Sequence, residues 1–263
     1  MLAIFRLLLV VFGCIASLVA TARADNGPEA LAAVAAARAG DWPLAYARAE
    51  QSKDLLAQKV VRWLDYTRAS PGGRAAEITA FIDQNPDWPL QKTLRRRAEE
   101  AMADESDDIA ADWFKQHPPI SGAGKLRAAQ LLMNHGDAAA GTAAVRAAWV
   151  DGDFSLITEQ RALAQAGSVL RPEDHQRRFD RLLWDGQTDA ARRLLPLLSA
   201  DYRVLAEARL ALASDAGNAD AIVSRVPPPL RADPGLVFEQ ARWQRRRDNY
   251  DAAAQLLLSD NNT

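Results

Sequence analysis

The sequence predicts an all-α fold, specifically an α-superhelix, or solenoid, of stacked helical hairpins. Apolar residues recur at helical spacing, as at Leu56, Val60 and Trp63, and no long stretch alternates apolar and polar residues as a strand does. The chain is rich in Ala, Leu, Arg and Glu, which are good helix formers. A short turn motif recurs between the predicted helices and would join them into hairpins.

This recurring turn begins with a glycine or a polar residue, and an alanine-containing helix start follows. Its copies are 40–45 (GDWPLA), 136–140 (GDAAA), 186–191 (GQTDAA) and the degenerate 248–253 (DNYDAA). A glycine in the left-handed conformation is expected to end one helix, and a polar residue or proline to start the next. The small alanines allow close approach of the two helices. Each hairpin of such an array covers the apolar face of its neighbour.

Start and stop signals divide the chain into about fourteen helices of roughly 9 to 16 residues. The stretch 85–89 (NPDWP) separates two of them, and Ser106 starts a helix that ends at 117–119 (HPP). The stretch 171–174 (RPED) opens another helix, with its acids near the positive end of the helix dipole. The three prolines at 227–229 require a short extended link.

The spacing of the hairpins is irregular, at 50 residues from Gly136 to Gly186 and 46 from Trp42 to Trp88. Tetratricopeptide repeats keep a period of about 34 residues, so the predicted array is tetratricopeptide-like only in a degenerate form. No long polar linker divides the chain, which predicts a single scaffold domain over residues 25–263.

Residues 1–24 have the pattern of a secretory signal peptide. Arg6 gives the positive start, 7–20 form the apolar segment, and 22–24 (ARA) offer a cleavage site after Ala24. The uncharged run is short for the roughly 20 residues of a membrane helix, so an uncleaved anchor is the less favoured alternative. We therefore expect export to the periplasm or beyond.

The single cysteine, Cys14, lies within this segment, so the exported part has none. A lipoprotein signal with Cys14 as the acylated residue is disfavoured, because Phe12 fits that site poorly. Without disulfides the exported chain depends on its hydrophobic core alone. The formal net charge of the whole chain is −2, and nothing in it indicates a surface for nucleic acid or anionic membranes.

No residue type in this chain has the spacing of a catalytic or metal site. His117, His135 and His175 are expected at helix ends or in a first turn, where they bind no metal. The acidic clusters 99–100 and 105–108 are assigned to polar faces and helix caps, because a general acid needs a shielded carboxyl in a cleft. We therefore assign no catalytic, cofactor-binding or metal-binding residue and expect no cofactor.

Two further residue groups have a structural and a functional interpretation. The triplets 95–97 and 245–247 (both RRR) are expected on solvated helix faces, and the alternative anion site is weakened because successive helical residues diverge. Tryptophans recur roughly once per hairpin. They are expected in the core, and a track of rings stacking on sugars is the alternative. They are Trp42, Trp63, Trp88, Trp113, Trp149, Trp184 and Trp243.

Several strings, taken in order, resemble the N-terminal superhelical region of soluble lytic murein transglycosylases of the alphaproteobacterial type. The resemblance covers roughly residues 28–258, and its specificity comes from the shared order of strings that are individually weak. The strings are NPDWP at 85–89, LRRRAE at 94–99, PPISGAGKL at 118–126, DRLLWDG at 180–186, residues 202–212, and DPGLVFEQARW at 233–243.

This resemblance implies a periplasmic protein of peptidoglycan turnover. Family members cleave the β-1,4 bond between N-acetylmuramic acid and N-acetylglucosamine without adding water, which leaves 1,6-anhydro ends. They use one Glu, in a goose-lysozyme-like C-terminal domain, first as general acid and then as base. That Glu is followed by Ser and, further on, by Gly-Leu-Met-Gln. Here Glu105-Ser106 reproduces only the dipeptide, and the sequence reaches Thr263 before the place of the catalytic domain.

The sequence thus predicts the superhelical scaffold part of a periplasmic lytic transglycosylase, without its catalytic domain and inactive alone. The expected partner is peptidoglycan, reached through the family's catalytic domain, with a periplasmic protein as a further partner. Nucleic acid is not expected as a partner, nor a membrane after signal cleavage. The alternative is a free-standing helical-repeat adaptor that docks a periplasmic protein. The apolar face expected on the closing hairpin, 250–258, favours the scaffold interpretation.

Overall fold

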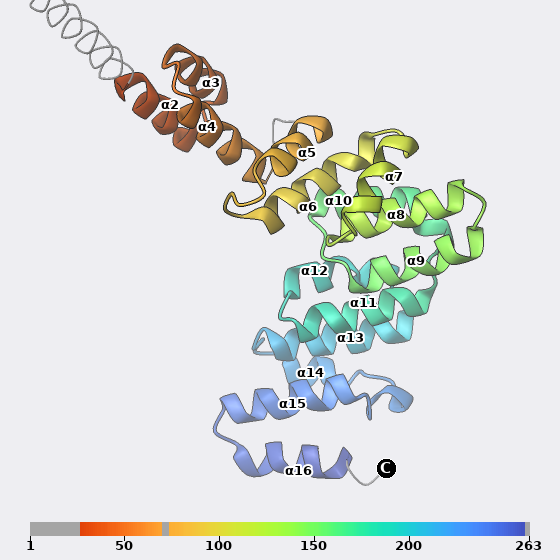
Figure 1. Ribbon diagram of the computed structural model, residues 1–263. Coiled ribbons are helices and arrows are strands. Elements are labelled where there is room, and N and C mark those ends of the chain that lie inside the picture. The colour runs from red at the N-terminus through yellow and green to blue at the C-terminus, as the bar shows by residue number, and fades with distance from the viewer. Residues whose placement is uncertain (1–26, 70–73, 261–263) are drawn as a thin grey trace, which may run out of the picture. The chain divides into compact units, whose positions relative to one another are not determined.

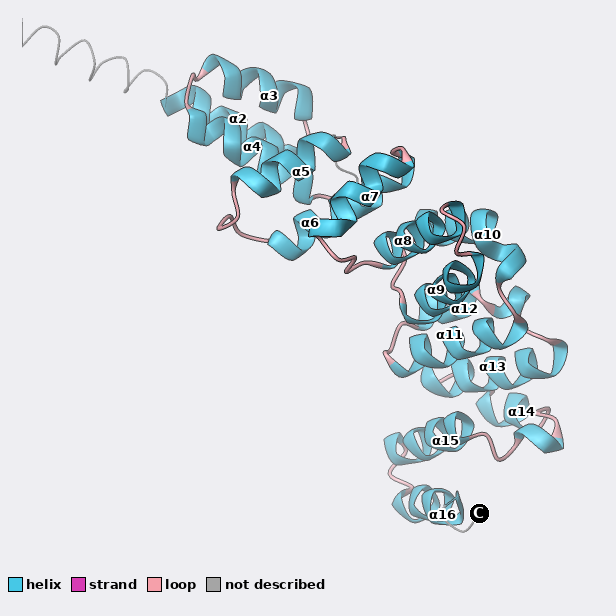
Figure 2. Cartoon of the chain, turned by 45° about the vertical axis from the view of Figure 1, so that its right-hand side comes forward, coloured by secondary structure: helices cyan, strands magenta, loops and turns pink. Residues whose placement is uncertain are grey.

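The structure is a computed structural model that describes residues 27–69 and 74–260. Every regular element within these ranges is an α-helix or a short 3-10 turn, which confirms the predicted all-α class (Figure 2). The predicted signal peptide and its cleavage site after Ala24 lie outside the described residues. Among the helices that are described, none is both long enough and apolar enough to cross a membrane.

The chain divides into two compact units, Met1–Glu105 and Ser106–Thr263. The sequence around this division contains neither a proline-rich nor a glycine-rich linker, and composition alone therefore indicates no division there. The predicted scaffold of residues 25–263 comprises both units, and each is described by itself.

The first unit is built from two sets of helices. The helices α2 and α3 form a hairpin on which α4 packs, and α5 pairs with α6 (Figure 1). Small side chains fill the α2–α3 interface, where Ala33, Ala37, Ala45 and Ala49 are buried together with Val61 of α4. The bounds are α2 (Gly27–Ala39), α3 (Trp42–Gln51), α4 (Leu55–Thr67), α5 (Ala75–Gln84), α6 (Gln91–Ala101) and a 3-10 turn (Met102–Asp104).

The second unit stacks its helices in successive layers. The helix α8 pairs with α9, which packs on α11; α11 packs on α13, α13 on α15, and α15 on α16 (Figures 1 and 2). The bounds are α7 (Asp107–Gln116), α8 (Gly122–Asn134), α9 (Ala138–Asp151), α10 (Leu156–Ala166), α11 (Pro172–Trp184), α12 (Thr188–Arg193), α13 (Ala200–Ala213), α14 (Ala219–Val223), α15 (Pro234–Arg246) and α16 (Tyr250–Asp260). This layering is what stacked hairpins require, and the superhelical path of the whole chain stays a prediction.

The three glycine copies of the recurring turn have the predicted left-handed glycine, and the degenerate copy has an aspartate in the same conformation. Gly40, Gly136 and Gly186 have φ values of 82°, 93° and 73°, and Asp248 of the degenerate copy has 59°. In each copy, the backbone N–H of the left-handed residue donates to the carbonyl three residues earlier in the chain. The N–H of the residue that follows donates to the carbonyl five residues before itself. This is the Schellman motif. A fifth copy at Asp215, with φ of 56°, ends α13 and is not predicted, because its sequence lacks the glycine signal.

The helices α8 and α9 approach each other closely at Gly141. A Cβ at this position would lie 2.3 Å from Cγ of Met133 and 3.0 Å from the carbonyl oxygen of Ala129. The absence of a side chain at Gly141 therefore sets the distance between these two helices.

We expect Gly141→Ala to lower the free energy of unfolding by about 1–3 kcal/mol, because the added methyl overpacks the interface. Gly167→Ala is the matched control, since nothing lies within 4 Å of a Cβ there and its φ is −58°. The control should change stability by less than about 0.5 kcal/mol. Urea unfolding followed by circular dichroism measures both, and equal midpoints would contradict the close approach.

A buried guanidinium joins three helices of the second unit. Arg178 of α11 is fully buried, and its Nη1 donates to the carbonyls of Trp149 at 2.6 Å and Gly152 at 2.7 Å. Its Nη2 donates to Glu159 of α10 at 3.2 Å, and Arg193 donates to the other oxygen of Glu159 at 2.8 Å. Burial lowers the pKa of Arg178 to about 10, so the side chain stays charged at neutral pH.

Arg178→Met should lower the free energy of unfolding by about 3–5 kcal/mol, because it leaves two carbonyls and part of a buried carboxylate without donors. Lys115→Ala serves as control, since its ion pair with Asp112 is 72% and 76% exposed. Solvent screens an exposed pair of this kind, so Lys115→Ala should unfold close to the wild-type midpoint. Urea denaturation of the two variants gives the comparison, and a wild-type midpoint for Arg178→Met would refute the assigned role.

Candidate functional site

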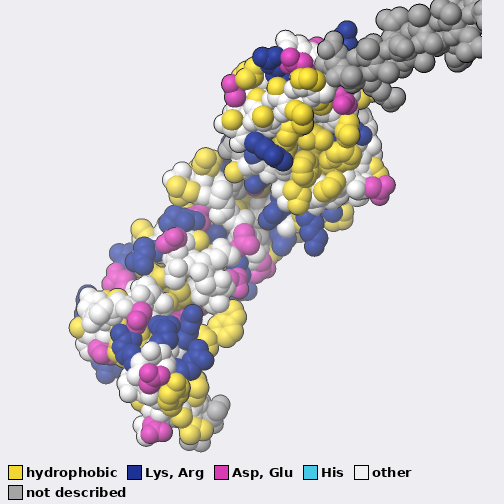
Figure 3. All heavy atoms as spheres, turned by 90° about the vertical axis from the view of Figure 1, so that its left-hand side faces the viewer, with side chains coloured by type: hydrophobic (Ala, Val, Ile, Leu, Met, Phe, Trp, Pro, Cys, Tyr) yellow, Lys and Arg dark blue, Asp and Glu magenta, His cyan; other side chains and the backbone are white. Residues whose placement is uncertain are grey.

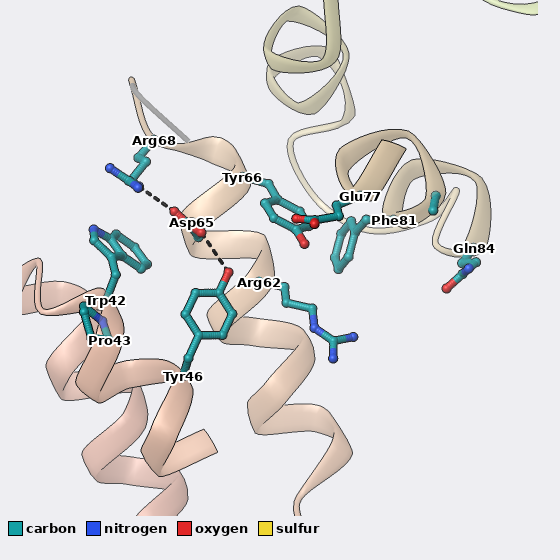
Figure 4. Close-up of a pocket in the computed structure, with 11 residues that line it drawn as sticks. Trp42, Pro43, Tyr46, Arg62, Asp65, Tyr66, Arg68, Glu77, Phe81 and Gln84 are labelled. Carbon is teal, nitrogen blue, oxygen red and sulfur yellow. Dashed lines mark hydrogen bonds and ion pairs between the residues drawn. The ribbon is translucent and has the colours of Figure 1, made fainter. Parts of the chain in front are cut away.

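A groove of about 770 Å³ opens in the first unit between α3, α4 and α5 (Figure 4). The residues that line it lie three or four positions apart on their helices, so each helix presents one face to the groove. We call this site the aromatic groove. Its lining consists of Trp42, Pro43 and Tyr46 from α3, Arg62, Asp65 and Tyr66 from α4, Arg68 directly after α4, and Glu77, Ala80, Phe81 and Gln84 from α5.

A buried carboxylate holds one wall of the groove. Asp65 is 2% exposed and accepts hydrogen bonds from the Tyr46 hydroxyl at 2.7 Å and from Nε of Arg68 at 2.5 Å (Figure 4). The Arg68 guanidinium in turn lies over the Trp42 ring, 4.7 Å from its centroid. These contacts fix both aromatic side chains of α3 against α4.

The tyrosines of the groove remain protonated well into the alkaline range. Burial, together with the hydrogen bond to Asp65, raises the pKa of Tyr46 far above its usual value of 10.0. Burial and the nearby charge of Glu77 also raise the pKa of Tyr66. The Tyr66 ring packs edge-on against Phe81 with centroids 5.6 Å apart. The hydroxyls are therefore neutral at physiological pH.

Several polar groups at the groove have spare hydrogen-bonding capacity. Arg62 is exposed and forms no ion pair or hydrogen bond with any residue the structure describes, and neither does the Tyr66 hydroxyl. Glu77 is exposed and pairs at 3.4 Å with Arg74, which is itself exposed. Gln84 is also exposed. The groove therefore offers both donors and acceptors to a ligand.

The chemistry of the groove suits binding and lacks the arrangement needed for catalysis. Both oxygens of Asp65 accept hydrogen bonds, and Glu77 is exposed, whereas a general acid lies in a shielded cleft. The lining contains neither serine, cysteine nor histidine to act as nucleophile or base. Elsewhere in the described ranges, no three His, Cys, Asp or Glu side chains form a group that could hold a metal ion.

The histidines lie where the sequence predicts them. His117 and His135 follow the last residues of α7 and α8, and His175 is in the first turn of α11. His117 stacks on Trp113 with centroids 3.8 Å apart, and Nδ1 of His135 lies 2.7 Å from the Leu131 carbonyl oxygen. Burial lowers the pKa of His175. Each histidine thus has a structural environment in its own helix or core.

One acidic residue departs from the expectation of polar faces and caps. Glu99 is fully buried, so that assignment is wrong for it; it directly follows Ala98, which with Leu94 forms the buried face of α6. Glu105 and Ser106 match their predicted places, since Glu105 follows the 3-10 turn and Ser106 immediately precedes α7.

Sequence reasoning missed a buried carboxyl on α15. Glu239 is 2% exposed, burial raises its pKa, and its Oε2 has no hydrogen-bond partner among the described residues. Its position three residues after the buried Leu236 is the signal that could have identified it. Since the side chain does not line the aromatic groove and hardly reaches solvent, it cannot meet a substrate as a general acid must.

The arginine triplets do not form single anion pockets, because their members diverge as predicted. Arg97 pairs with Glu100 at 2.7 Å. In the second triplet Arg246 donates to the Leu212 carbonyl, whereas Arg247 pairs with Asp215 and stacks 3.8 Å from the centroid of the Trp243 ring.

The core assignment of the tryptophans is confirmed for Trp113, Trp149 and Trp243, which are 8%, 1% and 7% exposed. It is wrong for Trp184, the last residue of α11, which is 72% exposed. Its ring lies against Phe238 with centroids 5.0 Å apart. The remaining three, Trp42, Trp63 and Trp88, are half-buried.

No family model matches this chain, and neither does any curated protein or any solved structure.

We expect Asp65→Ala to lower the free energy of unfolding by about 2–3 kcal/mol, because it leaves the Tyr46 hydroxyl and the Arg68 guanidinium without their acceptor. Tyr46→Phe removes one hydrogen bond and should cost about 1 kcal/mol. Gln84→Ala, at an exposed position of the same groove, is the control and should stay within about 0.5 kcal/mol. Urea unfolding measures all three variants. An Asp65→Ala variant with the unfolding free energy of the wild type would contradict the role of Asp65 in holding Tyr46 and Arg68.

The stabilisation by Tyr46 should also depend on pH. Its pKa is raised above 10.0 in the folded state, so its contribution is fully present below pH 10 and declines as the pH rises above that value. The difference in unfolding free energy between the wild type and Tyr46→Phe, measured from pH 7 to 11.5, should therefore shrink above pH 10. A difference that is constant or growing over this range would contradict the raised pKa.

Proposed function

We propose that this chain is the superhelical scaffold part of a periplasmic lytic murein transglycosylase, and that it binds rather than cleaves. The proposal is carried by the convergence of three family strings, 180–186, 202–212 and 233–243, on one ion cluster of the second unit. Residues that build a framework are those that a scaffold shares with its relatives.

Arg209 lies at the centre of this cluster and is 5% exposed. It pairs with Asp180, which also accepts a hydrogen bond from the Tyr202 hydroxyl at 2.7 Å, and it lies 3.6 Å from Asp233. A Cβ at Gly235 would come within 2.3 Å of the guanidinium carbon. The strings thus hold α11, α13 and α15 together.

Two of the other family strings also contain residues in framework positions. Gly122, in the string 118–126, lies where a Cβ would come within 2.6 Å of the Phe154 ring. In the first unit, the carbonyl of Pro89 accepts a hydrogen bond from Nε1 of Trp63 at 2.9 Å. The resemblance is therefore concentrated in residues that join helices, which supports a scaffold, and the aromatic groove supplies a binding surface without a catalytic pair.

Immunoprecipitation tests the proposal directly. Antibodies against the purified chain would be used to precipitate the native protein from a periplasmic extract, and the precipitate would be incubated with purified sacculi. We expect muropeptides with 1,6-anhydro ends, identified by mass spectrometry, whereas the purified chain alone should release none. Pre-immune serum is the control. A precipitate that contains the chain but releases no 1,6-anhydro products would overturn the proposal.

The adaptor alternative is favoured by exposed apolar side chains in the first unit. Leu31, Leu44, Leu55 and Leu56 are 75%, 43%, 78% and 59% exposed. Figure 3 shows hydrophobic side chains gathered in a patch on the upper part of the molecule in that view. Contiguous exposed apolar surface is typical of protein interaction sites. A stoichiometric periplasmic protein in a precipitate without 1,6-anhydro activity would select the adaptor function.

A further inference from the structure

We propose that the aromatic groove of the first unit binds a neutral saccharide chain. The geometry of the groove points to a hydroxyl-rich neutral ligand. The choice of a cell-wall glycan among such ligands rests on the proposed function.

Tyr46 provides a rigid ring for stacking. Its side chain is 36% exposed, while its hydroxyl is held at 2.7 Å by Asp65, which is buried and also bound to Arg68. The ring cannot turn away without breaking this hydrogen bond, so the exposed part of the Tyr46 ring stays accessible from the groove (Figure 4). Aromatic rings bury large flat apolar area, and the C–H face of a sugar ring is a matching surface.

The polar groups around this ring match hydroxyls. Arg62 donates, Glu77 accepts, and Gln84 and the Tyr66 hydroxyl can each do both. A sugar hydroxyl is likewise donor and acceptor at once, so adjacent hydroxyls of one ring can satisfy groups of both kinds. The groups come from α4 and α5, whereas the stacking ring comes from α3.

The charge of the groove selects against ions. Its two arginines, Arg62 and Arg68, are balanced by Asp65 and Glu77, and Arg68 is already paired with Asp65. Recognition of an anion such as phosphate or carboxylate uses clustered cations, and recognition of a cation uses a surplus of carboxylates. The groove has neither surplus. A volume of about 770 Å³ lies within the usual range for small-ligand sites.

Binding of chitotetraose to the purified full chain, measured by isothermal titration calorimetry, tests this inference. We expect saturable binding that weakens about tenfold in Tyr46→Leu, which removes the ring, and less than about threefold in Tyr46→Phe, which keeps it. Arg62→Ala should weaken binding several-fold. Trp184→Leu is the matched control, because it removes an exposed aromatic ring of the second unit and should leave the affinity unchanged.

Three results would overturn the inference. They are equal affinity of wild type and Tyr46→Leu, loss of binding in Trp184→Leu instead, and groove-dependent binding of polyglutamate or polylysine in preference to chitotetraose. If Tyr46→Leu fails to fold, as judged by circular dichroism, Arg62→Ala decides the matter, because Arg62 is exposed and makes no ion pair or hydrogen bond to the rest of the described chain. Lack of binding together with 1,6-anhydro products in the precipitate would remove this inference and leave the proposed function standing.

Discussion

The need to satisfy backbone carbonyls at helix ends governs much of this structure. Its described α-helices are only 5 to 14 residues long, and each leaves four carbonyls without intrahelical partners. Schellman turns satisfy some of them. Arginine side chains satisfy others at the end of α9: Arg178 donates to the carbonyls of Trp149 and Gly152, and Arg181 to those of Val150 and Gly152. Since both arginines belong to the neighbouring helix α11, closing α9 also attaches it to α11.

The fold class and the turns could be predicted because both depend on local chemistry. A left-handed glycine such as Gly136 leaves a direct signal in the sequence, whereas Asp215 adopts the same conformation without one. Burial of charge is harder to predict. Arg178 and Glu99 are charged residues of the kind expected on a solvated helix face, yet both are fully buried. Their environment is determined by tertiary neighbours and not by their own helices.

The aromatic groove could be predicted only in part. Trp42 is visible as a candidate sugar-stacking residue, but the ring that is both exposed and anchored is Tyr46. Its role depends on Asp65, 19 residues away and on another helix. Helical spacing shows which residues share a face of one helix, and it contains no information about which faces meet. Convergence of three helices on one groove therefore had to come from the structure.

The fork shape of the arginine side chain has a consequence for how this protein can vary. Arg178 and Arg181 each reach two carbonyl oxygens at once, which a lysine ammonium on its flexible stem does not reproduce with the same geometry. The left-handed turn positions, by contrast, accept either glycine or aspartate. Substitution is thus least tolerated at arginines that the sequence alone would place on the surface. The turn sequences that identify the hairpins can change while the hairpins themselves are kept.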